Sequence, residues 1–171
     1  MKPGRTMEQH FRESAGARCI SASLALAALA TLASPLAHAL VVSCTVSATA
    51  VAFGTYAPGQ TSALTSSGTV NVNCIVASGR NPVTIALSKG SSGSFTPRTM
   101  ASGLNTLSYN LYLDAAYSQI WGDGSGGSLT DNDSVNPGHP NINATVYGQI
   151  PPLLDPATGS YSDTITVTVS Y

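Results

Sequence analysis

Apolar and polar residues alternate one by one along several short segments, which is the pattern of a β-strand with one buried face. The clearest example is the C-terminal segment 164–171, in which Thr and Ser occupy the other face. Segment 70–76 alternates in the same way and places Cys74 on its apolar side. In the C-terminal strand the side chains predicted to face inward are Ile165, Val167, Val169 and Tyr171.

Shorter alternating runs predict further strands at 44–48, 83–87, 107–113 and 144–148. After the first of these, the apolar residues change parity, which indicates a bulge or bend near residues 49–50. Gly-, Asn-, Asp- and Pro-rich segments separate the strands, and 131–140 is one of these predicted loops. No stretch of ten or more residues has a helical period. The pattern predicts an all-β protein, an antiparallel β-sandwich.

Residues 1–39 have the features of a secretory signal peptide rather than of a strand. Basic residues precede an uncharged run from Cys19 to Leu36, and Ala37-His38-Ala39 supplies the small residues of a cleavage site. The run is rich in Ala and Ser and therefore too weakly apolar for a typical membrane anchor. We expect cleavage between Ala39 and Leu40, a secreted mature chain of residues 40–171, and no membrane anchor in it.

Charged residues are scarce, which limits the classes of partner. They make up 9% of the chain, against roughly 25% in an ordinary soluble protein. Residues 40–171 hold three basic residues and six aspartates, giving a net charge of −3 without any Glu. Because phosphate recognition needs clustered Lys and Arg, nucleic acid is not an expected partner.

Cys44 and Cys74 are the two cysteines that follow the predicted signal peptide. A pair of cysteines in a small secreted domain predicts one disulfide. The alternative, a metal site, would need further Cys or His ligands, and only His139 is available in the mature chain.

The residues that could support catalysis or metal binding do not form a convincing site. His139 lies between prolines in a predicted loop, and no second histidine follows the signal peptide. Asp123, Asp131 and Asp133 are the best calcium ligands on offer, but the calcium-loop pattern with its terminal Glu is missing. We therefore predict a protein that is not an enzyme and has no catalytic, cofactor or metal site.

At this point the mature sequence resembles the spore coat protein U domain family, whose members also serve as subunits of archaic chaperone–usher pili. Each matching segment is weakly specific alone, but together, in this order and with both cysteines, they are specific. The resemblance covers essentially all of 44–171 and is found in Cys44-Thr45-Val46, Phe53-Gly54-Thr55-Tyr56, Val70–Cys74, Leu87-Ser88-Lys89-Gly90, Arg98-Thr99-Met100, Leu107–Tyr112, Trp121-Gly122-Asp123-Gly124, Val146–Pro151 and Gly159–Thr164.

The resemblance implies an immunoglobulin-like sandwich that lacks its last strand. In such subunits a periplasmic chaperone lends a strand, and another pilus subunit, assembled at an outer-membrane usher, later replaces it. The C-terminal strand 164–171, with no later segment to pair with it, would be the acceptor edge. The implied function is a structural or adhesive subunit of a surface pilus, active in surface attachment and biofilm formation and exported through the periplasm.

One departure from the family concerns the segment that would be donated to a neighbour. Cleavage after Ala39 leaves only Leu40–Ser43 before Cys44, and four residues are too short to cross a sheet. We therefore expect a subunit at the tip of an assembly, where loop residues such as Phe95, Met100 and Trp121 could contact a surface. For Trp121, packing in the core is the favoured alternative. Two alternatives stay open: a secreted coat protein that does not polymerise, and a carbohydrate-binding or enzymatic sandwich.

Overall fold

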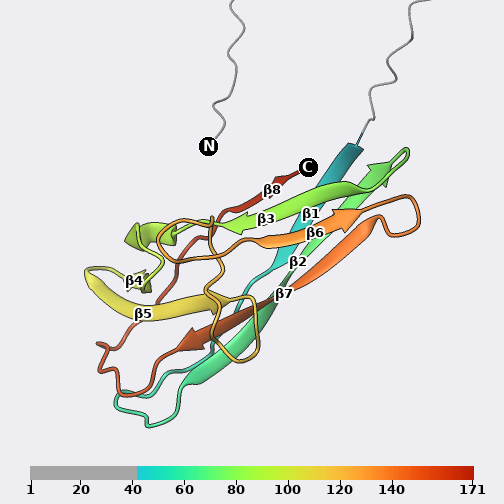
Figure 1. Ribbon diagram of the computed structural model, residues 1–171. Coiled ribbons are helices and arrows are strands. Elements are labelled where there is room, and N and C mark those ends of the chain that lie inside the picture. Colours follow the sequence, from blue (N-terminus) through green and yellow to red (C-terminus); the bar gives the residue numbers. More distant parts are fainter. Residues whose placement is uncertain (1–41) are drawn as a thin grey trace, which may run out of the picture. The chain divides into compact units, whose positions relative to one another are not determined.

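The computed structural model describes residues 42–171, which form two antiparallel sheets packed face to face (Figure 1). Within this part the one helical element is a short 3₁₀ turn, η1 (Gly90–Ser92). The larger sheet has the order β1 (Val42–Thr49), β2 (Leu64–Val76), β7 (Asn141–Ile150), β5 (Asn105–Tyr112), β4 (Arg98–Ser102). The smaller sheet has the order β6 (Asp131–Val135), β3 (Asn81–Leu87), β8 (Val167–Ser170). The predicted all-β antiparallel sandwich is confirmed.

The core lies between the inner faces of the two sheets, where the alternating apolar residues meet. At its centre Trp121 is completely buried, and its indole Nε1 donates a 3.0 Å hydrogen bond to the carbonyl oxygen of Ile85. The other large core side chains come from five strands: Val70, Val72, Val83, Ile85, Leu87, Leu107, Tyr109, Leu111, Val135, Ile142, Val146 and Ile150. Burial of these side chains is the main stabilising contribution to the sandwich.

The predicted strands exist, but their lengths and number differ from the prediction. β2 and β7 are longer than the alternating runs that indicated them, and β4 was not predicted. The prediction that 131–140 is entirely a loop is wrong, because residues 131–135 form β6. β6 is an edge strand, so its sequence Asp-Asn-Asp-Ser-Val buries only Val135 and carries almost no apolar alternation.

The C-terminal strand is shorter than predicted, because residues 164–166 separate from β3. The carbonyl oxygen of Ser88 accepts two hydrogen bonds from the Arg98 guanidinium, so the Thr166 amide donates to the Ser88 hydroxyl instead. Further back, Ser162 exchanges two backbone hydrogen bonds with Ala101 of β4. The segment before β8 therefore crosses from the larger sheet to the smaller one.

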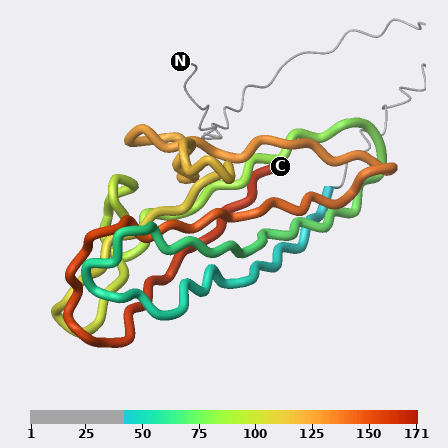
Figure 2. Tube along the Cα trace, turned by 90° about the horizontal axis from the view of Figure 1, so that it is seen from below, coloured from blue at the N-terminus to red at the C-terminus, as the bar shows by residue number. Residues whose placement is uncertain are grey.

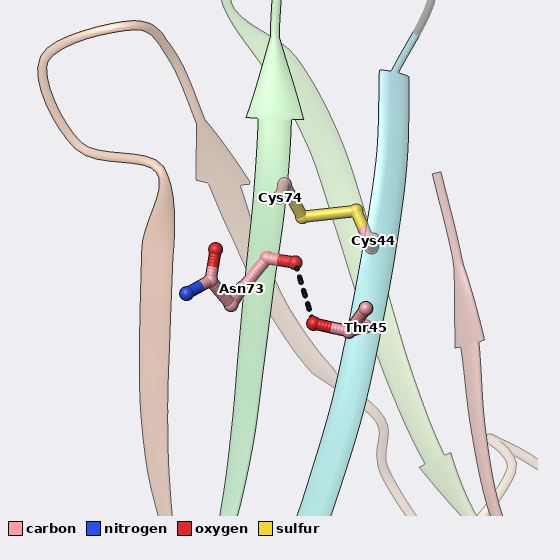
Figure 3. The surroundings of a disulfide bond; sticks show 4 residues. All are labelled: Cys44, Thr45, Asn73 and Cys74. Atoms are coloured by element: carbon pink, nitrogen blue, oxygen red, sulfur yellow. Dashed lines mark hydrogen bonds between the residues drawn. A yellow bond between two sulfur atoms is a disulfide. The ribbon is translucent and has the colours of Figure 1, made fainter.

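The predicted disulfide is confirmed and joins the first two strands (Figure 3). Cys44 and Cys74 lie directly opposite each other in the β1–β2 register, with their Cα atoms 4.0 Å apart. Cys74 is buried and Cys44 is half-buried. The bridge closes a loop of 30 residues, for which the chain-entropy estimate is on the order of 3.5 kcal/mol of stabilisation.

The predicted bend after β1, where the apolar residues change from even to odd positions, is present in the structure. β1 ends at Thr49, and the chain then turns inward so that Val51 and Phe53 pack over Gly148 of β7. A Cβ atom at Gly148 would lie 2.5 Å from Val51 Cγ1 and 2.8 Å from Phe53 Cζ, so this crossing requires glycine. The Phe53 ring also packs edge-on against Tyr109, with the ring centroids 6.0 Å apart.

The predicted signal peptide and its cleavage site between Ala39 and Leu40 lie outside the described residues. In the part of the chain that the structure describes, no helix has the length and apolar character needed to cross a membrane.

Candidate functional site

β1 and β8 are edge strands of different sheets (Figures 1 and 2), and residues of both border one cavity. Within residues 42–171, β1 pairs only with β2, and β8 pairs only with β3. Between them opens a cavity of about 440 Å³, bordered by residues 48–53 on one side and 161–167 on the other. Its floor reaches the core side chains Val70, Leu87, Met100, Tyr109, Leu111 and Val146. We call this feature the edge groove.

One wall of the edge groove is β8 with the residues before it. The amide of Ser88 donates a 3.0 Å hydrogen bond to the carbonyl oxygen of Thr166. Along a strand, the N–H and C=O groups of successive residues point to opposite sides. Since those of Thr166 point toward the β3 side, the even-numbered residues of this segment bond toward β3. The backbone N–H and C=O groups of Ile165, Val167 and Val169 consequently face the open gap. Their apolar side chains are only half-buried, although they point toward the core.

The other wall is β1. The alternation of backbone N–H and C=O groups also shows which of its residues leave these groups without a partner in β2. The Cys74 amide donates to the carbonyl oxygen of Pro140, on the β7 side of β2, so Cys44 and Cys74 are not a hydrogen-bonded pair. Cys44, Val46 and Ala48 therefore direct their N–H and C=O groups away from β2 and toward the gap. Val46 shares the inward face with Cys44 and yet is 44% exposed, because no strand covers it.

A second cavity, of about 530 Å³, extends the edge groove toward the far end of the domain. Val51, Phe53, Met100 and Tyr161 line both cavities and so lie between them. The Tyr161 hydroxyl donates to the carbonyl oxygen of Ala157 at 2.8 Å, which fixes the ring. The two cavities together extend from Ala48 of β1 and Val167 of β8 to Pro58 and Pro156.

A polar cluster at the groove fixes the start of the C-terminal segment. The Asp163 carboxylate accepts hydrogen bonds from the Ser91 and Thr164 amides and from the Tyr109 hydroxyl, at 2.9, 2.8 and 2.7 Å. Burial opposes the charge of Asp163, but these hydrogen bonds outweigh it and lower the pKa of the carboxyl group. Burial, followed by the bond to Asp163, raises the pKa of Tyr109 above its ordinary value. Tyr109 therefore stays a neutral hydrogen-bond donor.

Two of the four predicted acceptor residues, Ile165 and Val167, line the cavity. Val167 and Val169 lie in β8, and Ile165 lies just before it. Tyr171 follows β8 and is 57% exposed in the chain alone. The second wall, from Val46 to Phe53, was not predicted as part of the site, although the parity change after Ala48 was a signal for it.

The other predicted candidates do not form a site in the described residues. His139 is exposed in a turn, where its amide bonds back to Asn136. No three His, Cys, Asp or Glu side chains of residues 42–171 gather where they could hold a metal ion. The prediction that Phe95, Met100 and Trp121 could contact a surface is wrong, because all three are buried in the domain.

The fold and the site define a class: a disulfide-linked β-sandwich domain with an open, apolar groove between two edge strands. The pattern of the Spore Coat Protein U domain matches residues 29–168, and the chain belongs to that family. The comparison with curated proteins gives no significant match.

Among solved structures, the fold is similar to a chain in the crystal structure of the CsuC-CsuE chaperone-tip adhesion subunit pre-assembly complex from archaic chaperone-usher Csu pili of Acinetobacter baumannii. The two chains share 24% identical residues and superpose with a TM-score of 0.54. The alignment covers 77% of this chain and 40% of that one, so this protein spans less than half of its structural neighbour. At this identity the likeness establishes the shared fold.

Proposed function

We propose that this protein is a secreted subunit of a chaperone–usher surface pilus. Its edge groove accepts one β-strand, first from a periplasmic chaperone and then from another subunit assembled at an outer-membrane usher. It therefore acts as a structural protein rather than as an enzyme. The family and the fold of the structural neighbour support this assignment.

The observation that carries the proposal is the pair of unpaired edges that border one apolar groove. An added strand would pair with the free backbone groups of Ile165, Val167 and Val169. Its alternate side chains would enter the cavity and cover Val46. The residues that line the cavity include no Lys, Arg or Glu. Their one carboxylate, Asp163, already accepts three hydrogen bonds. The groove thus suits an uncharged, alternating strand.

The direct test is co-expression with a candidate periplasmic chaperone, followed by capture on a tagged chaperone. We expect the wild-type subunit to be captured and Val167→Asp to be lost, because a charge would enter the apolar groove. Asp155→Asn, an exposed loop change, is the matched control and is expected to be captured normally. Equal capture of Val167→Asp and wild type would contradict the proposed groove.

The proposal includes a terminal position in the pilus. β1 already begins at Val42 and pairs with Val76 there, so Ser43 is also held in the sheet. Cleavage after Ala39 would leave Leu40 and Val41 as the only residues free to reach a neighbour. N-terminal sequencing of the secreted protein tests this position. A mature start well upstream of Ala39 would supply a donor segment and overturn it.

A terminal subunit would contribute to surface attachment and biofilm formation through its exposed loops. With Phe95, Met100 and Trp121 buried, the most exposed apolar loop residues are Leu104 and Leu153. Leu104→Ser with Leu153→Ser is expected to reduce attachment of cells to a surface while leaving the melting temperature of the domain unchanged. Unchanged attachment would remove these loops from the proposal.

A further inference from the structure

The two edges of the smaller sheet carry different chemistry. β3 is its central strand, with β6 on one side and β8 on the other. Ile85 of β3, which is completely buried, lies opposite Asp131 of β6 on one side and opposite Val169 of β8 on the other. On the same face, Asp133 lies opposite the buried Val83. At Ile85, one edge therefore places a carboxylate where the other edge places a valine.

These aspartates lie on the inner face of the sheet. Residues directly opposite each other in an antiparallel pair share a face, and Val135 on the same face of β6 is completely buried. Asp131 is half-buried and Asp133, nearer the rim, is exposed. The pKa of Asp131 is raised by its burial and then by the neighbouring charge of Asp133. Both carboxylates thus border the core and still reach water at the open edge.

Asp133 accepts a 2.7 Å hydrogen bond from the Ser134 amide, and the side-chain contacts on the outer face of β6 bring no cation to either carboxylate. Thr84 donates to the Asn132 side chain at 3.0 Å, and the Arg80 Nε donates to the Ser134 hydroxyl at 2.7 Å. The nearby guanidinium is therefore directed to the face opposite Asp131 and Asp133. A strand added to β6 would cut these carboxylates off from water without giving them a cation.

We infer that Asp131 and Asp133 close the β6 edge against pairing with the β6 strand of a second copy of this chain. In an antiparallel β6–β6 pair the four carboxylates would lie together on one buried face. Like charges facing each other across strands are destabilising, and an unpaired buried charge is costly. Inward-pointing charge is a recognised way to protect an edge strand from association. The aspartates thus restrict strand addition in this sheet to β8, on its opposite edge.

The test uses the full chain exported to the periplasm with a donor segment fused after Tyr171, so that the edge groove is filled. Asp131→Thr with Asp133→Thr removes both charges and introduces β-branched residues that suit an edge strand. Asp123→Asn with Asp155→Asn is the matched control, because it removes the same charge from loop positions. Asp131→Asn with Asp133→Asn serves as the second test variant if the Thr pair does not fold.

Sedimentation velocity and backbone amide exchange are the measurements. We expect the β6 variant to self-associate at least about tenfold more tightly than wild type and control, with slowed amide exchange within residues 131–135. A β6 variant that stays as monomeric as wild type, or that dimerises with protection elsewhere, would overturn the inference. If the fused segment fails to stabilise the domain, the proposed groove fails. The comparison of exchange at 131–135 between variant and wild type still decides the role of the aspartates.

Discussion

Replacing Arg98 with methionine is expected to destabilise the domain strongly, although Arg98 makes no ion pair within hydrogen-bond distance. The side chain is completely buried, and desolvation lowers its pKa. Its guanidinium donates to three acceptors: the carbonyl oxygens of Ser88 and Trp121 and the Asn110 side chain, at 2.7–3.0 Å. It also lies over the Phe95 ring, 4.9 Å from the centroid. Four separate segments of the chain are thus held by one side chain.

The expected magnitude follows from the acceptors left behind. Methionine fills a similar volume, but the buried carbonyl oxygens of Ser88 and Trp121 lose this donor. Each unsatisfied buried group costs about 1–3 kcal/mol. Removal of a buried charge offsets part of this cost. We expect a net loss of about 2–4 kcal/mol in the free energy of unfolding, which corresponds to a fall of roughly 6–15 °C in melting temperature for a domain of this size.

The assay is thermal and urea unfolding of the secreted domain carrying a fused donor segment. Arg80→Met is the matched control: Arg80 is exposed, its Nε bonds only to Ser134 in the described structure, and its loss is expected to change stability by less than about 0.5 kcal/mol. Because Ser88 also bonds to Thr166, Arg98→Met is expected to loosen the start of β8 as well. If Arg98→Met is as stable as Arg80→Met, the assignment of Arg98 as the structural link is refuted.

Three further predictions follow from the disulfide, the groove and the Asp163 cluster. Cys44→Ser with Cys74→Ser should lose about 2–5 kcal/mol of stability and reduce accumulation in the periplasm, whereas thiol labelling of the native wild-type protein should modify neither cysteine. The mature domain alone should be unstable and aggregation-prone at high concentration, and a donor segment fused after Tyr171 should restore a stable monomer; a highly stable monomer without any donor would count against an open edge. Asp163→Asn should destabilise the domain at neutral pH. Because folding lowers the pKa of Asp163, its contribution to the free energy of unfolding is fully present above the ordinary carboxyl pKa. This contribution is lost as the pH falls through the lowered pKa, so the stabilities of wild type and variant should converge in acid.

The sequence was most informative where a strand has one buried and one exposed face. β2, β3, β7 and the residues around β8 show this alternation, and their inward residues form the core. The edge strand β6 and the short strand β4 do not show this alternation. β6 buries one apolar side chain, and one of the two buried side chains of β4 is a charged arginine. Arg98 shows why: a completely buried arginine is recognisable only once its three acceptors, distant in sequence, are placed around it.

For the site, the sequence indicated one wall and left the other undefined. The uncharged alternation at Ile165, Val167 and Val169 marked an edge that could accept a strand. The opposite wall depends on the pairing of β1 with β2 and on the inward bend to Phe53, which are long-range features of the sheets. Core packing was the favoured interpretation of Trp121, but the sequence did not indicate that its indole bonds to the carbonyl oxygen of Ile85.

Residue-resolved amide exchange on the secreted domain, with and without a fused donor strand, tests the accepting groove most directly. The account predicts that the amides of Ile165, Val167 and Val169 exchange rapidly in the domain alone and become strongly protected when the donor is present. The amides of Thr168 and Ser170, which face β3, should be protected in both. Unchanged exchange at the three odd-numbered residues, in a domain that the donor nevertheless binds, would contradict strand addition at β8.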